Sequence, residues 1–176
     1  MAKFQNKYNS ESIRLKNWDY STEAFYIVTI CSDLKKHFFG NISKNGDSEK
    51  AVLIKSIIGE ISEKYWYEIP NYYSYAVLVE FVIMPNHLHG IIFLDKKGER
   101  SNSTNKFGPQ KENLGAIIRG YKASVKRFAN SNKINFDWQS GYFDRIIRNE
   151  NELNNFRQYI IDNPDNWISD KNYSED

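Results

Sequence analysis

Two of the three histidines in the chain, His87 and His89, stand two positions apart in the run MPNHLHGIIFL. The β-branched and aromatic residues around them predict strands, and side chains two apart on a strand leave the same face. The pair therefore offers two imidazole nitrogens at one place, an arrangement suited to binding a metal ion or to holding an anion at two points. A pair of half-exposed strand histidines without a ligand would give the same short pattern.

A tyrosine and an asparagine four positions apart form the second pattern. The apolar residues Leu153, Phe156 and Ile160 have helical spacing and predict a helix in this region. Tyr159 and Asn163 then share one face, beside the buried stripe of that helix. A phenol in this position can reach across the edge of a sheet. Because a tyrosine at the rim of a helix–sheet interface usually packs its ring and leaves its hydroxyl in water, the pattern alone leaves packing and chemistry both open.

Basic side chains that can contact a phosphate backbone form the third pattern. Four lie on a predicted helix and two border a short predicted strand: Arg119, Lys122, Lys126, Arg127, Arg145 and Arg148. A solvated helix face is the commoner origin of such a stripe. The formal net charge is only +2, so binding to nucleic acid would require this kind of local clustering.

The elements that must position these residues follow from the spacing of apolar residues. The expected strands are 25–31, 73–83, 87–94 and 143–147. The expected helices are 47–65, 114–129 and 149–163, the last ended by Pro164. The order β-α-β-β-α-β followed by a helix predicts an α+β fold of the ferredoxin-like split βαβ kind. Such a fold has an antiparallel sheet of about four strands with helices on one face, plus here a C-terminal helix that carries Tyr159.

Length and composition limit the class of protein. The 176 residues predict one domain, residues 1–176, with a basic N-terminal arm at 1–20 and a mobile loop at 95–110. The single cysteine, Cys31, excludes a disulfide framework and a cysteine-cluster metal site. Because the sequence has no apolar run of about 18 residues and its N-terminal stretch lacks an apolar core, we expect a cytoplasmic protein with no membrane partner.

Taken together, these patterns resemble the REP-associated tyrosine transposases, which belong to the single-tyrosine HUH transposase superfamily. Three stretches spread over residues 14–167 carry the resemblance: RLKNWDYSTEAFYIVTICSDLKKHFFG, FVIMPNHLHGIIF and WQSGYFDRIIRNENELNNFRQYIIDNPDNW. His87 and His89 match the two histidines of the family motif. Tyr159 matches the nucleophilic tyrosine, and Asn163 matches the polar residue four positions later that helps to complete the metal site.

The resemblance implies a metal-dependent endonuclease and strand transferase. Such an enzyme nicks and rejoins single-stranded DNA at hairpin-containing sites through a 5′-phosphotyrosine intermediate. Tyr159 would be the catalytic residue, and His87, His89 and Asn163 would bind Mg²⁺ or Mn²⁺. Two imidazoles and an amide are softer than the ligands Mg²⁺ usually takes, which favours Mn²⁺.

The resemblance also implies partners for the rest of the surface. The basic residues named above would hold the DNA backbone, and aromatic residues such as Trp138 or Tyr142 would stack on unpaired bases. The partner would be single-stranded or hairpin DNA. We expect a monomer rather than a homodimer, associated with the nucleoid when it is bound to DNA.

Two other classes of protein stay open. A non-catalytic hairpin-binding protein derived from a transposase would keep the same fold, since fold does not determine function. The presence of all four motif residues argues for the enzyme instead. A zinc hydrolase would use the two histidines, but it leaves Tyr159 unexplained, and the sequence shows no obvious carboxylate or third histidine near the pair.

Overall fold

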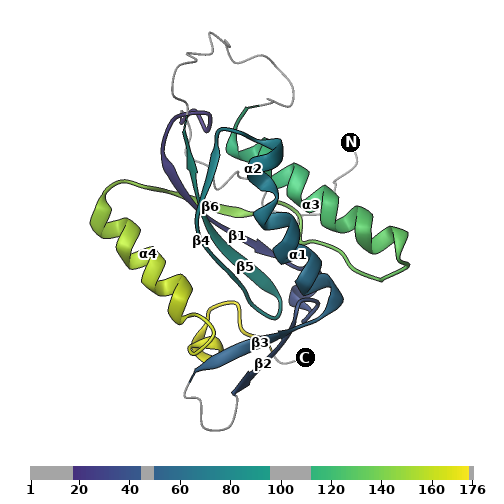
Figure 1. Cartoon of the computed structure of the whole chain (residues 1–176). Helices are drawn as coiled ribbons and strands as arrows, with labels where there is room; N and C mark the ends of the chain where they lie inside the picture. Colours follow the sequence, from purple (N-terminus) through teal and green to yellow (C-terminus); the bar gives the residue numbers. More distant parts are fainter. Residues whose placement is uncertain (1–17, 45–49, 96–111, 175–176) are drawn as a thin grey trace, which may run out of the picture.

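An antiparallel sheet carries the histidine pair. The computed structural model describes residues 18–44, 50–95 and 112–174, and in it four strands pair in the order β4-β5-β1-β6 (Figure 1). They are β1 (Phe25–Cys31), β4 (Ala76–Ile83), β5 (His87–Leu94) and β6 (Phe143–Ile147). Every neighbouring pair is antiparallel. The α+β fold with a four-stranded antiparallel sheet, expected from the sequence, is confirmed.

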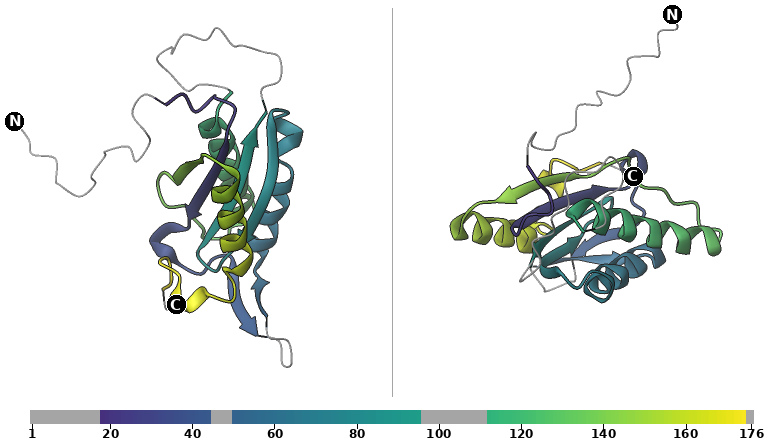
Figure 2. Two further views of the ribbon diagram at one scale, coloured as in Figure 1. Left: turned by 90° about the vertical axis from the view of Figure 1, so that its left-hand side faces the viewer. Right: turned by 90° about the horizontal axis from the view of Figure 1, so that it is seen from above.

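Helices cover both faces of this sheet. They are α1 (Ile57–Tyr67), α2 (Ile69–Tyr72), α3 (Leu114–Ser131) and α4 (Glu150–Asp162). Two short 3-10 turns lie at Asp33–Lys35 and Trp167–Ser169. Figures 1 and 2 show α1 and α3 on one side of the sheet and α4 on the other. The sheet thus lies between α4 and the pair α1 and α3.

Side-chain alternation along β5 decides which residues meet which layer. Leu88 and Ile92 enter the larger core, which lies between the sheet and helices α1 and α3. The alternate residues His87, His89 and Ile91 point to the α4 face. There Ile91 belongs to a smaller buried cluster, together with Ile27, Ile147 and Ile160.

The larger core packs against the face of β5 that points away from the two histidine side chains. Trp66 of α1 is fully buried, stacks on Phe81 with 4.6 Å between ring centres, and meets Tyr121 edge-on. A β-carbon at Gly90 would overlap the Trp66 ring. A glycine is therefore required for the strand that carries His89 to approach α1 so closely.

The structure corrects one predicted element. The helix expected at 47–65 begins only at Ile57, and the residues before it form β3 (Ala51–Lys55). This strand pairs with β2 (Gly40–Lys44) in a separate two-stranded sheet. Ser56 ends the strand and caps the helix, because its hydroxyl accepts a hydrogen bond from the Gly59 N–H.

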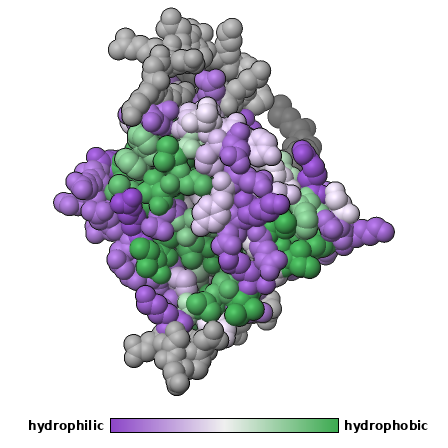
Figure 3. All heavy atoms as spheres, viewed as in Figure 1, coloured by the Kyte–Doolittle hydropathy of each residue, from purple (hydrophilic) through white to green (hydrophobic). Residues whose placement is uncertain are grey.

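Exposed apolar side chains are distributed over several elements. Val52 and Ile54 of β3 are 42% and 56% exposed, and Ile161 of α4 is 53% exposed. On the face seen in Figure 3, hydrophobic residues lie in several groups with hydrophilic residues between them. Within the part of the chain that the structure describes, no helix is both long and apolar enough to span a membrane.

Two sequence-based expectations fall on residues outside the described ranges. The basic arm expected at 1–20 lies mostly within 1–17, and the loop expected at 95–110 lies mostly within 96–111. The assignment of residues 1–176 to a single domain stays a prediction.

Candidate metal and tyrosine site

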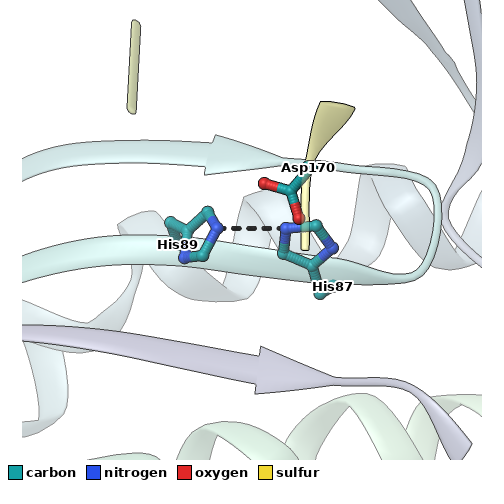
Figure 4. A group of neighbouring side chains, drawn as sticks. All are labelled: His87, His89 and Asp170. Carbon is teal, nitrogen blue, oxygen red and sulfur yellow. Dashed lines mark hydrogen bonds between the residues drawn. The ribbon is translucent and has the colours of Figure 1, made fainter. Parts of the chain in front are cut away.

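The two histidine side chains are buried and face each other. His87 and His89 are 0% and 1% exposed, and their Nε2 atoms lie 3.1 Å apart (Figure 4). The Nδ1–H of His87 donates to Asn86 Oδ1 at 2.7 Å, and His89 Nδ1 lies 2.8 Å from Thr29 Oγ1. Because each ring is held through its Nδ1, both Nε2 atoms are directed at the same point. The pair is not the half-exposed one that the sequence also allowed.

Burial keeps both imidazoles in the neutral form that binds metal ions. It lowers the pKa of His87, which the neighbouring His89 lowers further. Burial also lowers the pKa of His89, to about 4. At neutral pH the two rings therefore carry no positive charge that would repel a cation.

These shifts predict that the metal-free protein loses stability in mild acid. Between the ordinary histidine pKa of 6.5 and the native value of about 4, the unfolded chain binds protons that the folded chain does not. The free energy of unfolding should therefore decrease as the pH is lowered through this window, by up to about 1.4 kcal/mol per pH unit for each histidine. Urea denaturation with EDTA at several pH values in this window measures the slope. A His89→Gln variant with an unchanged slope would contradict the assignment.

Tyr159 reaches the histidines from α4. Its hydroxyl lies 3.2 Å from His89 Nε2 and donates to Asp170 Oδ2 at 3.1 Å. Burial, and then the negative charge of Asp170 and the hydrogen bond to it, raise the pKa of Tyr159 to about 12. The phenol is therefore protonated at neutral pH, and it needs an acceptor for its proton if it is to act as a nucleophile.

Helix α4 is fixed at both its start and its buried face. The side chain of Asn149 accepts a hydrogen bond from the Glu152 N–H at 2.8 Å, as expected for a cap. The Glu152 carboxylate in turn accepts from the Arg148 N–H at 2.8 Å. One residue beyond Tyr159, Ile160 is 1% exposed and anchors the helix in the smaller cluster. This anchoring directs Tyr159 to the histidines and buries Asn163, which is 2% exposed.

Asp170 is a site residue that the sequence analysis missed. It follows the turn Trp167–Ser169, and its carboxylate lies beside both histidines in Figure 4. Ligand atoms of His87, His89 and Asp170 all lie within 4.8 Å of one another. The expectation that no carboxylate lies near the histidine pair is wrong, because the chain turns back after α4 and brings in a residue that no regular spacing links to the motif.

Hydrogen bonds keep Asp170 ionised. Its Oδ2 accepts from Asn163 Nδ2 at 3.0 Å, and its Oδ1 accepts from the Asn172 N–H at 2.6 Å. Burial acts to raise the pKa of this carboxyl, but these hydrogen bonds and the nearby His87 hold the pKa below its usual value. The site thus contains one fixed negative charge beside two neutral imidazoles.

The donor set fits a divalent cation. Neighbouring ligands in an octahedral shell of radius about 2.1 Å lie about 3 Å apart, close to the observed separation of the two histidine nitrogens. Asn163 Oδ1 is buried and has no hydrogen-bond partner among the described residues, and the amide nitrogen of the same side chain bonds Asp170, so an unpartnered oxygen lies close to the carboxylate. The Asp170 carboxylate adds the hard ligand that Mg²⁺ and Mn²⁺ prefer, although two histidines and a carboxylate also suit Zn²⁺.

Comparison with known proteins shows the family of the chain. An uncharacterized protein of Haemophilus influenzae is 35% identical over 181 residues, which cover 95% of this chain and 97% of that protein. The chain belongs to the same family as that protein. A scan against models of known protein families finds no match.

Among solved structures, the chain resembles a REP-associated tyrosine transposase bound to a REP hairpin. The TM-score is 0.55 at 14% identity, covering 86% of this chain and 73% of that chain. At this identity the likeness concerns the fold alone, so the present chain has a transposase-like fold. A putative transposase from Deinococcus radiodurans R1 gives a TM-score of 0.40 at 12% identity, which is too low to support an argument.

The basic residues expected to bind DNA are divided between the two faces of the sheet. Arg145 of β6 lines the groove beside Tyr159, and Arg148 is exposed just after that strand. The other four lie on α3, on the face opposite the histidines: Arg119, Lys122, Lys126 and Arg127. The structure thus brings only Arg145 to the site, and a role for any of the six in DNA binding stays a prediction.

Two of the α3 lysines stabilise a loop. Lys122 Nζ donates to the carbonyl oxygens of Gln139 and Gly141, each at 2.7 Å. Lys126 Nζ donates to the Phe136 carbonyl at 2.6 Å and pairs with Asp137 at 3.1 Å. These ammonium groups are therefore already engaged within the protein.

The aromatic residues considered for base stacking lie in or against the larger core. Trp138 is 8% exposed, and its Nε1–H donates to the Lys122 carbonyl at 3.0 Å. Tyr142 is partly buried against the same core. Tyr121 is 3% exposed and packs in the larger core, with its hydroxyl donating to the Ser62 carbonyl at 3.1 Å.

Asn86 links the histidine strand to the segment that carries Asp170. While its Oδ1 accepts from His87, its Nδ2 donates to the Asn172 carbonyl at 2.9 Å and to Ser174 Oγ at 3.0 Å. It is fully buried. One side chain therefore orients an imidazole and holds the backbone next to the carboxylate.

Replacing Asn86 is expected to weaken metal binding. Asn86→Ala removes the acceptor that orients His87, and loss of such a partner typically costs about 10- to 100-fold in metal affinity. Titration calorimetry with Mn²⁺ measures the change, and nitrogen-15 NMR of the imidazoles reports whether His87 keeps its proton on Nδ1. Ser174→Ala is the control: it removes a hydroxyl that contacts Asn86 Nδ2, the Lys35 carbonyl and His37 but not the His87–His89 pair, and it should change the affinity little. Equal Mn²⁺ affinity in Asn86→Ala and the wild type would refute the orienting role.

Proposed function

We propose that the protein is a metal-dependent single-stranded DNA endonuclease and strand transferase. It would nick and rejoin DNA at hairpin-containing sites through a 5′-phosphotyrosine intermediate, as a transposase. The observation that carries this proposal is the position of the Tyr159 hydroxyl, 3.2 Å from His89 Nε2 and 3.1 Å from Asp170 Oδ2. The fold supports it, because the solved transposase that shares this fold is bound to a REP hairpin.

Four side chains would hold the divalent ion, Mg²⁺ or Mn²⁺: His87, His89, Asn163 and Asp170. When bound, the ion would polarise a non-bridging oxygen of the scissile phosphate and offset the charge that develops there. Asn163 has two roles, since its amide nitrogen holds Asp170 while its oxygen is left for the ion. Asn86 and Thr29 keep the two imidazoles oriented.

Tyr159 performs the covalent step. Its oxygen attacks the phosphorus, the new O–P bond forms, and the bond from phosphorus to the 3′ oxygen breaks. The 5′-phosphate stays on Tyr159 and the other strand end leaves as a 3′-hydroxyl. A second 3′-hydroxyl then attacks the phosphotyrosine, which joins two strands and restores the phenol. Among the described residues, Asp170 Oδ2 lies within hydrogen-bond distance of the phenol and can accept its proton, because a carboxylate keeps lone pairs when it binds a cation, whereas the single lone pair of His89 Nε2 would be taken by the ion.

The partner would be single-stranded or hairpin DNA, bound by a monomer. In the cell the protein would be cytoplasmic and would associate with the nucleoid through that DNA. Arg145 would contact the backbone, because it is the basic residue of the predicted set that lines the groove beside Tyr159.

Formation of a covalent adduct tests the proposal. The protein is incubated with end-labelled single-stranded hairpins from the DNA flanking its own gene, with Mg²⁺, Mn²⁺, Zn²⁺ or EDTA, and the products are separated on a denaturing gel. We expect a protein–DNA adduct that requires the metal ion. Hairpin binding without an adduct under every condition would instead favour a non-catalytic hairpin-binding protein derived from a transposase.

A further inference from the structure

A groove opens beside Tyr159 on the α4 face of the sheet. Its volume is about 820 Å³. Helix α4 packs over β4 and β5, so the side of the sheet formed by β1 and β6 is left open next to it. Residues from both strands, from α4 and from the segment after α4 line the groove, among them Ile27, Phe143, Arg145, Phe156 and Lys171.

Phe143 gives this groove an exposed aromatic ring. It belongs to the edge strand β6 and alternates with the buried Asp144, so its side chain points to the α4 face. The ring is 41% exposed. An isolated exposed aromatic side chain needs no explanation, but this one lies in a concave site that contains the tyrosine hydroxyl.

Positive side chains lie over the aromatic rings of the groove. Lys171 Nζ is 5.4 Å from the centre of the Phe143 ring, and the Arg145 guanidinium is 5.4 Å from the centre of the Phe156 ring. Aromatic faces next to cations are the pattern with which proteins bind unpaired nucleotides, because the ring stacks on a base while the cation meets a phosphate.

The other charged groups of the groove are held in place by partners within the protein. Arg145 also pairs with Glu152, which leaves its guanidinium held at the ring of Phe156. Asp170 belongs to the histidine cluster, and Asp162 accepts a hydrogen bond from Gln158 Nε2 at 2.8 Å. Lys171 is exposed, so its flexible ammonium can move from the Phe143 ring to a phosphate.

We propose that this groove binds one unpaired nucleotide of the DNA strand, next to the scissile phosphate, with its base stacked on Phe143. This inference rests on the proposed function, because a phosphate at Tyr159 places a neighbouring nucleoside in the groove. Stacking on a ring accepts every base, so the groove selects a single strand rather than a sequence. Paired bases of a duplex cannot make the same contact.

Equilibrium binding by a variant that lacks the nucleophile tests this inference. In the Tyr159→Phe background with Mn²⁺, fluorescence anisotropy is measured with a labelled oligothymidylate of about 12 nucleotides and with an abasic strand of the same length. Phe143→Ala should weaken binding to the oligothymidylate about 10-fold, the effect of one lost stacking contact, and should change binding to the abasic strand little. Phe143→Tyr should restore the affinity.

The matched control is Tyr72→Ala on α2, which removes an aromatic side chain that is 76% exposed and lies outside the groove. It should leave both affinities unchanged. The inference is overturned if the parent does not bind the oligothymidylate, if Phe143→Ala binds it as tightly as the parent, or if the loss is equal for the abasic strand. Because no cleavage is needed, a failure to form the covalent adduct would count against the proposed function and leave this binding result standing.

Discussion

Tyr159→Phe is expected to abolish covalent adduct formation and DNA cleavage while leaving metal binding intact. The change removes one oxygen atom, the one that lies between His89 and Asp170. Because loss of a nucleophile removes the covalent path entirely, the rate of adduct formation should fall at least about a thousandfold. Denaturing gels with labelled hairpin DNA and Mn²⁺ measure this rate, and calorimetry measures Mn²⁺ affinity on the same preparations.

The control for this change is another tyrosine of the same region. Tyr173 is 37% exposed and contacts Trp167 edge-on, so Tyr173→Phe alters a nearby phenol without touching the histidines. It should form the adduct at the wild-type rate. An adduct that persists in Tyr159→Phe would show that Tyr159 is not the nucleophile. Tyr121 could not replace it without unfolding, since it is buried in the opposite core.

Asp170→Asn is expected to weaken Mn²⁺ binding by at least about 100-fold and to reduce adduct formation in parallel. Asparagine has nearly the same shape, so the change removes the negative charge of the cluster and replaces one of the two acceptor oxygens of Asp170 with a donor. Replacing even the outer partners of metal ligands costs about 10- to 100-fold, and a ligand itself should cost at least as much. Calorimetric titration with Mn²⁺ measures the effect.

Asp165→Asn provides the comparison for Asp170→Asn. Asp165 lies on the same segment, and its Oδ1 accepts the Ala51 N–H at 2.6 Å, a role that an asparagine oxygen can keep. Its Mn²⁺ affinity should equal that of the wild type. If Asp170→Asn also binds Mn²⁺ normally, the carboxylate is not a ligand, and the ion would be held by the histidines and Asn163.

The parts of the site that lie on regular elements were predictable from the sequence. A strand sends alternate residues to one face, and this alternation is enough to place His87 and His89 together. A helix brings residues four apart onto one side, and this spacing is enough to place Tyr159 with Asn163. Both pairs meet in the structure because the strand and the helix pack face to face.

The parts that depend on irregular chain or on tertiary contacts were not predictable. Asp170 reaches the histidines through a turn whose position depends on hydrogen bonds to distant groups, among them the bond between Asn86 and the Asn172 carbonyl. Val52 and Ile54 stand two apart, as on a strand, but the helical spacing that begins at Ile57 extends the predicted helix over them, and pairing with β2 makes their segment a strand. Spacing also could not show that the ammonium group of Lys122 already holds two carbonyl oxygens.

The close contact between Gly90 and Trp66 has a consequence for how this family can vary. Position 90 faces α1, on the opposite side of the strand from His89, yet any side chain there would push the histidine strand away from α1 and move His89 relative to Tyr159. We therefore expect natural selection to hold the glycine and the tryptophan as a pair, as strictly as the residues that perform the chemistry. An engineer who transplants the histidine motif to another sheet would also need to transplant the glycine and the tryptophan ring that packs against it.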